Sequence, residues 1–334
     1  MGTCISHHFP PSIVMPVKQV KAAALQLECY AGHVEENLAH STQLVENAVH
    51  RGARLVLLPE LMPSGYQLTE AIWDSAETLN GKSVTYLKSL AKRHGIYLGT
   101  GFLEADGEDF FNSFVLIDPG GEVAGRVRKS PAASVEAYFY RAGNDSHVIE
   151  TDLGRIGIAI CYEMLLYERL LELHQASVDM VLIPAAAGRP RPFIPGDIAR
   201  FDRMLRQVPP HYAEALGVPV IMANRTGRLH TPLPGGLPYL KSSFPGYSMI
   251  VDSDGVVKAA LSQEEGVIVD DVCLDSSRKI ETPPKRFGKL WAVPMPWYGF
   301  IWPLTQRMGE RAYANNARRK EHAKLICHAD MSRK

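Results

Sequence analysis

The chain has 334 residues with 36 basic and 36 acidic side chains, so its formal net charge is zero. This balance argues against a protein that holds nucleic acid with its whole surface. A hydrophobic content of 46% and a charged content of 22% are ordinary for a globular protein. The five cysteines are odd in number and form no CxxC pair, which argues against a disulfide framework or a zinc knuckle. We therefore expect reduced thiols and a cytoplasmic protein.

The two ends of the chain differ in composition from the middle. Residues 1–17 are predicted to be a flexible leader, although Gly2 and Cys4 also fit a short lipidation pattern. Residues 281–334 are first aromatic and then basic, and a helix is expected from Leu304 to Leu325. The apolar stretch at 290–304 contains three prolines, so we do not expect it to span a membrane.

Strands and helices alternate through the first hundred residues. Apolar runs predict three strands, at residues 20–27, 54–58 and 96–102. Val34–His50 has apolar residues at helical spacing, and Ser83 is a candidate cap for a second helix that ends near His94. This β-α-β-α-β order indicates a layered α/β fold.

The second part of the chain repeats this organisation. Hairpins are expected at two matching places, residues 113–128 and 247–261, each around a Gly- and Asp-containing turn. Between them we predict strands at 156–160, 180–183 and 218–223, a helix at 165–175 and another before Leu216. Two similar halves favour one domain, residues 18–280, in which two sheets pack together and helices lie outside.

No cofactor or metal motif is complete. Gly81-Lys82-Ser83 lacks the first glycine of a phosphate loop, and Gly99-Thr100-Gly101 lacks the third glycine of a dinucleotide fingerprint. The twelve histidines include no HExxH pair. We therefore expect neither a cofactor nor a bound metal.

Three chemically active side chains directly follow predicted strands. Glu60 follows LVLLP, Lys129 follows the strand that ends in Val127-Arg128, and Cys161 follows IGIAI. Sites in α/β sheets assemble at the carboxyl ends of strands. A thiol that attacks, a carboxylate that takes its proton and an ammonium that stabilises negative charge form a complete nucleophilic set.

The segments around these residues resemble the nitrilase superfamily of carbon–nitrogen hydrolases, over about residues 18–280. They are LVLLPELMPSGY around Glu60, RVRKSPAASVEAYFYRAG around Lys129 and GRIGIAICYEMLLYERL around Cys161, with weaker matches at 222–227 and 244–257. The resemblance implies a four-layer α-β-β-α sandwich. It also implies catalysis without a cofactor by a Glu-Lys-Cys triad.

By this similarity, Cys161 is the expected nucleophile, Glu60 the general base and Lys129 the oxyanion stabiliser, with Glu136 as a second glutamate. The backbone N–H of Tyr162 is a further candidate donor to the oxyanion. Candidate substrate-binding residues follow the catalytic ones or a strand end: Tyr66, Tyr138, Tyr162 and Ala186. The arginines at 189, 191, 200 and 203 are either solvated charges or a partner for a substrate carboxylate.

The run Cys161-Tyr162-Glu163 differs from the Cys-Trp-Glu run common in nitrilases, so we favour an amidase acting on a small linear amide. A nitrile or an N-carbamoyl compound is the alternative substrate within the same superfamily. Two alternatives belong to other classes: a non-catalytic partner-binding protein on this fold, and a membrane-surface protein that uses residues 290–304. The resemblance also implies a homodimer or larger homo-oligomer, in which the tail after residue 280 has a place.

Overall fold

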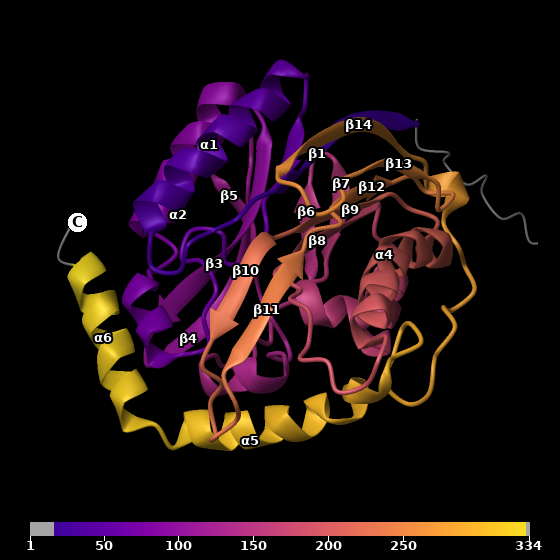
Figure 1. Cartoon of the computed structure of the whole chain (residues 1–334). Coiled ribbons are helices and arrows are strands. Elements are labelled where there is room, and N and C mark those ends of the chain that lie inside the picture. The colour runs from indigo at the N-terminus through magenta and orange to yellow at the C-terminus, as the bar shows by residue number, and fades with distance from the viewer. Residues whose placement is uncertain (1–16, 332–334) are drawn as a thin grey trace, which may run out of the picture.

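The computed structural model describes residues 17–331, so the expected leader and its lipidation pattern lie almost entirely outside the described part. Over that range, two six-stranded sheets face each other and helices cover their outer sides (Figure 1). This arrangement confirms the predicted α-β-β-α sandwich. None of the described helices combines the length and the apolar character needed to cross a bilayer.

The first sheet is built by the first half of the chain together with one late strand. Its order is β14 (Gly266–Leu274), β1 (Lys18–Gln26), β2 (Leu55–Leu57), β3 (Tyr97–Asp106), β4 (Asp109–Ile117) and β5 (Val123–Arg128). Strands β1, β2 and β3 are parallel, and the others add antiparallel edges. Helices α1 (Val34–His50) and α2 (Lys82–His94) lie on its outer side (Figure 1).

The second sheet repeats this plan. Its order is β13 (Val257–Ala260), β12 (Met249–Val251), β9 (Val220–Asn224), β8 (Met180–Ala185), β7 (Gly154–Ile158) and β6 (Val148–Thr151). Strands β7, β8 and β9 are parallel. Helices α3 (Tyr167–Gln175) and α4 (Asp197–Leu216) accompany it. The recurrence confirms the two similar halves expected from the hairpins.

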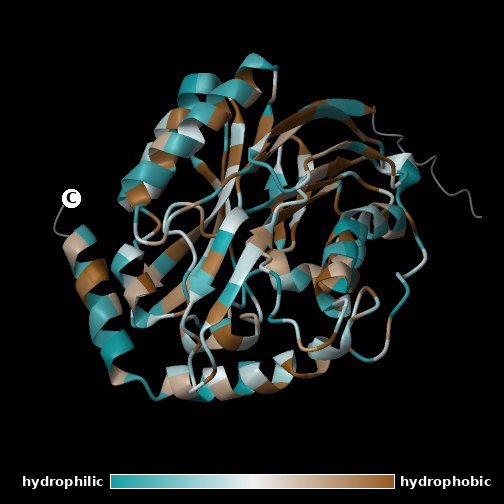
Figure 2. Ribbon diagram, in the orientation of Figure 1, coloured by the Kyte–Doolittle hydropathy of each residue, from teal (hydrophilic) through white to brown (hydrophobic). Residues whose placement is uncertain are grey.

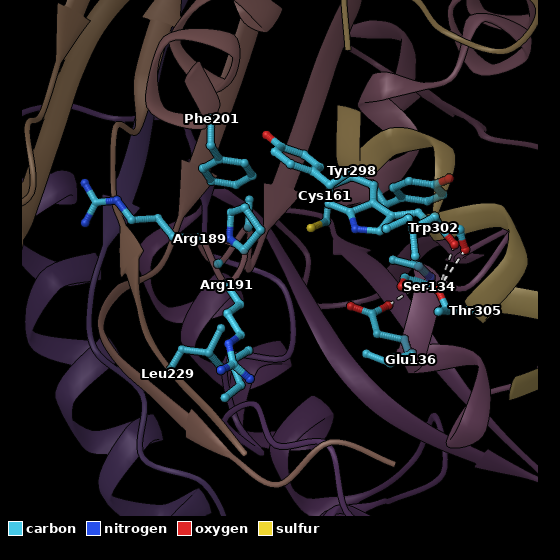
Figure 3. Close-up of a pocket in the computed structure, with 18 of the residues that line it drawn as sticks. Ser134, Glu136, Cys161, Arg189, Arg191, Phe201, Leu229, Tyr298, Trp302 and Thr305 are labelled. Atoms are coloured by element: carbon cyan, nitrogen blue, oxygen red, sulfur yellow. Dashed lines mark hydrogen bonds between the residues drawn. The ribbon is translucent and has the colours of Figure 1, made fainter. Parts of the chain in front are cut away.

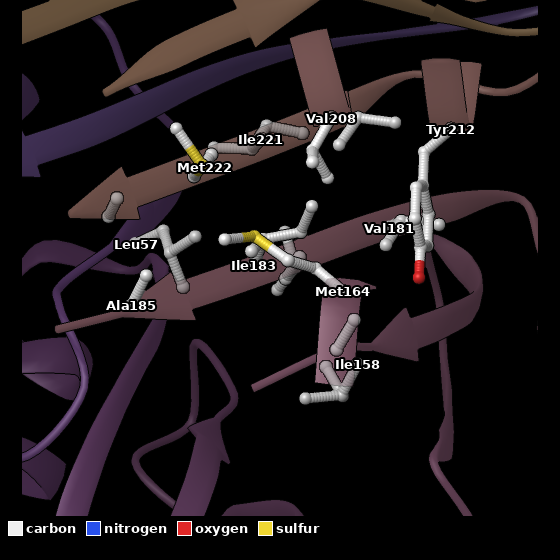
Figure 4. Close-up of a cluster of buried hydrophobic side chains, with 14 of the residues drawn as sticks. Leu57, Ile158, Met164, Val181, Ile183, Ala185, Val208, Tyr212, Ile221 and Met222 are labelled. Carbon is white, nitrogen blue, oxygen red and sulfur yellow. The ribbon is translucent and has the colours of Figure 1, made fainter. Parts of the chain in front are cut away.

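Burial on both faces explains why the central strands read as continuous apolar runs. Every residue of β8 is buried. Its neighbour β9 contacts α4 and also β1 and β2 of the other sheet, so the centre of the second sheet is covered on both faces. Figure 4 shows Val208 of α4 near Ile221 of β9 and Tyr212 of α4 near Val181 of β8. Hydrophobic residues accordingly gather along the strands, whereas the outer helices carry many hydrophilic ones (Figure 2).

Several short elements connect the sheets. A two-stranded ribbon, β10 (Thr226–Thr231) with β11 (Leu240–Pro245), projects from the end of β9. The 3-10 turns are η1 (Glu70–Ser75), η2 (Ser134–Tyr138), η3 (Cys161–Leu165), η4 (Ser276–Arg278) and η5 (Trp297–Phe300). Neither the ribbon nor β14 was predicted from the sequence. β14 depends on pairing with β1, which is far away in the chain, whereas the two strands of the ribbon are neighbours joined by residues 232–239.

The expected single helix from Leu304 to Leu325 is wrong. The chain instead forms α5 (Trp302–Ala314) and α6 (Ala317–Met331), with a break at Asn315 and Asn316 (Figure 1). The Asn316 side chain accepts a hydrogen bond from the Arg319 N–H at 3.3 Å, which caps the second helix. Arg319 also forms an ion pair with Asp109, and α6 packs against β3 and β4.

The expectation that Ser83 caps α2 is also wrong. The helix begins one residue earlier, at Lys82, and Gly81 is its N-cap residue. Ser83 lies inside the first turn, where its backbone N–H donates to the Glu77 carboxylate at 2.8 Å. A carboxylate from the preceding segment therefore supplies the acceptor that the serine hydroxyl was expected to provide.

Candidate active site

The carboxyl ends of three strands bring Glu60, Lys129 and Cys161 together. Glu60 lies just after β2, Lys129 follows β5 directly, and Cys161 begins η3 after β7. All three are buried, with exposed fractions of 0%, 1% and 7%. Because β2 and β5 belong to one sheet and β7 to the other, the cluster lies where the two sheets face each other.

The ammonium of Lys129 lies between two carboxylates. Its Nζ donates to Glu60 Oε1 at 2.6 Å and to Glu136 Oε2 at 2.7 Å. Glu60 is held further by the Asn112 side-chain amide, at 2.7 Å from Oε1, and by the Ala186 N–H, at 2.7 Å from Oε2. Buried charges are tolerated when they are paired and hydrogen-bonded in this way. The structure thus brings all four predicted catalytic residues into one site.

Glu136 is oriented by its own turn and by Tyr66. It lies in η2, where its Oε2 accepts from the Ala133 N–H at 3.2 Å. The Tyr66 hydroxyl donates to Glu136 Oε1 at 2.8 Å. Both oxygens of this carboxylate are therefore occupied by protein donors, and the side chain has little freedom to turn away from Lys129.

Cys161 occupies a strained backbone position. Its φ of +51° lies in the left-handed region, which costs a non-glycine residue on the order of 1–3 kcal/mol. The Glu163 carboxylate stabilises this bend, because it accepts from the Ile160 N–H at 2.7 Å and from the Ser130 N–H at 2.5 Å. The same side chain thus ties the residue before the thiol to the residue after Lys129.

Glu163 was not singled out from the sequence as a site residue. It is fully buried and also pairs with His147 Nε2 at 2.9 Å and with Arg169 Nη2 at 3.5 Å. Burial alone would raise the pKa of Glu163, but His147, Arg169 and the Ser130 N–H lower it below its ordinary value. The signal available in the sequence is an acid two residues after the cysteine, within an otherwise apolar CYEML run.

The protonation states follow from burial and from the neighbouring charges. Burial raises the pKa of the Cys161 thiol well above its usual range, and Glu60 raises it further, while Lys129 opposes the rise. Burial would lower the pKa of Lys129, but Glu136 and Glu60 lift it well above its ordinary value. Burial likewise raises the pKa of Glu136, and Lys129 offsets only part of that effect. The resting site therefore holds a neutral thiol beside a charged ammonium.

The model of the carbon–nitrogen hydrolase family matches residues 21–281. The chain belongs to the carbon–nitrogen hydrolase family. It is 30% identical over 285 residues to the N-carbamoylputrescine amidase of Solanum tuberosum, across 82% of this chain and 90% of that protein. It is therefore an enzyme of the hydrolase class whose relatives are amidases and nitrilases.

Solved structures support the fold of this carbon–nitrogen hydrolase. A carbon–nitrogen hydrolase from Helicobacter pylori superposes with a TM-score of 0.69 at 22% identity, covering 78% of this chain and 91% of that one. A nitrilase-superfamily protein from Saccharomyces cerevisiae superposes with a TM-score of 0.63 at 22% identity, covering 78% and 91%. At these identities the likeness concerns the fold, and it confirms the expected nitrilase-type sandwich.

A cavity of about 480 Å³ opens beside the thiol of the hydrolase (Figure 3). Cys161 and Glu136 line it, and so do three of the predicted substrate-binding residues, Tyr66, Tyr162 and Ala186. Among residues 17–331, no group of three or more His, Cys, Asp or Glu side chains is arranged to hold a metal ion.

Tyr138, the fourth predicted substrate-binding residue, does not line this cavity, because its ring lies between α5 and the loop that joins β10 to β11. A Cβ placed on Gly309 of α5 would come within 2.8 Å of this ring, and one on Gly235 within 2.7 Å of its hydroxyl. Tyr138 therefore contacts the C-terminal segment, which the sequence analysis had not placed near η2.

Proposed function

We propose that this hydrolase cleaves a linear, non-peptide amide C–N bond through a thioester on Cys161. The observation that carries the proposal is the position of the Lys129 ammonium, which is held between Glu60 and Glu136 beside a buried thiol that lines a cavity. Each component of a nucleophilic attack on a carbonyl is then present within one site.

The first step forms the thioester carbon–sulfur bond. Because the pKa of Cys161 is raised, its proton transfers to Glu60 as the sulfur attacks the carbonyl carbon, rather than beforehand. The carbonyl π electrons move to oxygen and create a tetrahedral oxyanion. Lys129, whose raised pKa keeps it charged, and the Tyr162 N–H stabilise that oxyanion. One such donor typically contributes about 3–4 kcal/mol.

The second step breaks the C–N bond. The tetrahedral intermediate collapses, the nitrogen takes the proton held by Glu60, and ammonia or an amine leaves while the acyl group stays on sulfur. Water then attacks the thioester as Glu60 accepts one of its protons. When the carbon–sulfur bond breaks, the proton returns to the sulfur and the carboxylic acid is released.

Glu136 has a different task from Glu60. Its carboxylate accepts a second hydrogen bond from Lys129, in addition to the one that Glu60 accepts. This second bond holds the ammonium in place beside the thiol. Of the two glutamates, Glu60 also has the stronger electrostatic effect on the thiol, which favours it as the proton acceptor. We therefore propose Glu60 as the general base and Glu136 as the residue that positions Lys129.

A second candidate is hydrolysis of an N-carbamoyl compound. The observation in its favour is the 30% identity to the N-carbamoylputrescine amidase of Solanum tuberosum over nearly the whole length of that protein. The same thiol attack serves both reactions, because each begins at a carbonyl carbon bonded to nitrogen. The two candidates differ in the group that occupies the cavity and in the products. An amide yields a carboxylic acid, whereas a carbamoyl group yields carbon dioxide.

The test is an ammonia-release screen over aliphatic amides, ω-amides, nitriles and N-carbamoyl amino acids. The wild type, the Cys161→Ala variant and a Cys29→Ala variant are compared. Cys29 is a matched control, because it is also a buried free thiol. Burial raises its pKa to about 11, and the charges that act on it are Arg225, Glu265 and Glu28 instead of Lys129. We expect turnover by the wild type and by Cys29→Ala alone. Turnover retained in Cys161→Ala would overturn the proposed mechanism.

A further inference from the structure

The cavity beside Cys161 is larger and more apolar than the chemistry requires. Its volume of about 480 Å³ falls in the range of roughly 300–1,000 Å³ that accommodates whole small-molecule ligands. Apart from the catalytic corner, its walls are dominated by large hydrophobic side chains such as Met204, Leu229, Leu240, Ile301 and Trp302. A small polar amide would leave most of this surface without a partner.

The charges around the cavity are unsuited to a cation. Among the described residues that line it, Glu136 is the one carboxylate, and its oxygens accept from Lys129, Tyr66 and Ala133. The guanidinium of Arg189 is engaged by Asp202, at 2.6 Å and 2.8 Å.

Arg191 is the second arginine of the lining. It is exposed and has no hydrogen-bonding or ionic partner within residues 17–331. In Figure 3 its side chain extends toward Leu229 and away from Cys161 and Glu136. The unpaired charge that the described residues add to this lining is therefore positive, and an ammonium placed beside Arg191 would meet repulsion that solvent screens only in part.

The C-terminal segment builds one wall of this cavity, although it follows the residues matched by the family model. Trp297, Ile301 and Trp302 all line the cavity. The indole N–H of Trp297 donates to Asp197 at 3.1 Å, and the Trp302 ring packs edge-on against Tyr162 at 5.6 Å. The wall is thus attached both to α4 and to the residue that follows the thiol.

We propose that the substrate carries a bulky apolar group on the acyl or amine side of the scissile bond, without a cation at its far end. The inference rests on the proposed amide hydrolysis and adds its substrate class. A substrate of this class differs from N-carbamoylputrescine, the compound that the name of the Solanum tuberosum relative gives. Residues 297–302 then act as specificity-determining residues.

The test measures kcat/KM for acetamide, butanamide and hexanamide, and for N-butyl and N-hexyl acetamide. Burial of each additional methylene is expected to raise kcat/KM about fourfold until the cavity is filled. The first series identifies an apolar acyl group, and the second identifies an apolar amine. Replacing hexanamide by 6-aminohexanamide is expected to lower kcat/KM at least about tenfold.

Ile301→Ala and Leu304→Ala form a matched pair of variants. Both side chains are exposed apolar residues of the C-terminal segment, at 42% and 61%, but only Ile301 lines the cavity. We expect Ile301→Ala to lower kcat/KM for hexanamide, relative to kcat/KM for acetamide, about threefold to tenfold. We expect Leu304→Ala to keep the wild-type ratio.

Failure of this inference is distinguishable from failure of the proposed function. If acetamide is hydrolysed as well as the longer amides, the apolar substrate class is wrong and the hydrolysis stands. If the wild type hydrolyses no amide, binding still decides the inference. Calorimetry with Cys161→Ala should then show binding of hexanamide or of N-hexyl acetamide, and no binding of 6-aminohexanamide. An equal affinity for hexanamide and 6-aminohexanamide, or binding of neither uncharged amide, would overturn it.

Discussion

The hydroxyl groups of Ser134 and Thr305 lie 2.7 Å apart and share a hydrogen bond. Ser134 begins η2, the turn that carries Glu136, and Thr305 lies in the first part of α5. Gly309, one turn further along α5, lies directly against the backbone of residues 137 and 138. The C-terminal segment therefore supports the same turn that holds a carboxylate beside Lys129.

Replacing Gly309 should loosen this support. A Cβ at this position would come within 2.8 Å of the η2 backbone, so Gly309→Leu must push α5 away. We expect the free energy of unfolding to fall by about 1–3 kcal/mol, and amide turnover to fall with it. Chemical denaturation and kcat/KM would measure the two effects. The control is Met308→Leu at a half-exposed neighbouring position, which should change neither the free energy of unfolding nor kcat/KM. If Gly309→Leu also changes neither quantity, the contact between α5 and η2 is dispensable.

The buried ion network below Cys161 should make stability depend on Glu163. Glu163→Gln leaves His147 and Arg169 without their carboxylate, and we expect about 3–5 kcal/mol of unfolding free energy to be lost at pH 7. Because the folded-state pKa of Glu163 is lowered, its contribution is present above the unfolded value of 4.5 and lost as the pH falls through the folded value. The difference between wild type and variant should therefore shrink below about pH 4.5 in urea titrations.

Glu172→Gln is the control for this measurement. Glu172 pairs with the same Arg169, but its side chain is 42% exposed, so solvent screens the interaction. We expect a loss below about 1 kcal/mol. A comparable loss in the two variants would mean that burial of Glu163 is not the cause.

A covalent intermediate should accumulate in Glu60→Gln. Glutamine can take a proton neither from the attacking thiol nor from the water that attacks the thioester, so both steps are slowed. An acyl group that does form on Cys161 is therefore expected to stay there during long incubation. Intact mass spectrometry after incubation with an amide should show a mass increase equal to the acyl group, and peptide mapping should place it on Cys161. Acylation of Cys29 or Cys273 instead would show that the nucleophile is another thiol.

The pH profile of turnover should respond to Tyr66. Burial raises the pKa of Glu136, and the Tyr66 hydroxyl partly opposes this by donating to the charged carboxylate at 2.8 Å. Tyr66→Phe removes that donor, so the acid limb of kcat/KM should move to higher pH by about one unit. Tyr212→Phe, whose buried hydroxyl has no partner in the described part of the chain, should keep the wild-type profile. If the acid limb of kcat/KM does not move in Tyr66→Phe, then the ionisation of Glu136 does not set that limb.

The expected homo-oligomer remains a prediction, and the C-terminal segment is where it can be tested. Phe300, Leu304 and Met308 recur every fourth residue and are 81%, 61% and 50% exposed, an arrangement typical of an interface. We expect deletion of residues 305–334, or the pair Phe300→Ser and Met308→Ser, to lower the molar mass in light scattering. An unchanged mass in both variants would remove this segment from any interface.

Much of the fold was predictable, because local periodicity reflects which face of an element is buried. The helix Val34–His50 has the bounds expected from its apolar spacing, and the strand C-termini that carry Glu60, Lys129 and Cys161 lie where apolar runs end. In a parallel sheet those ends meet at one edge. The candidate catalytic residues could therefore be chosen before their distances were known.

What the tertiary structure decided rests on contacts between residues far apart in the chain. Arg319 pairs with Asp109 across 210 positions and redirects α6, and Ser134 meets Thr305 across 171. Glu163 gains its role from His147 and Arg169, which no local pattern associates with it. The amino-acid sequence by itself determined most strands and helices of the two halves and the nucleophilic set, since these depend on nearest neighbours and on burial. The shape of the cavity and its C-terminal wall depend on how distant surfaces fit together, and only the folded chain brings those surfaces into contact.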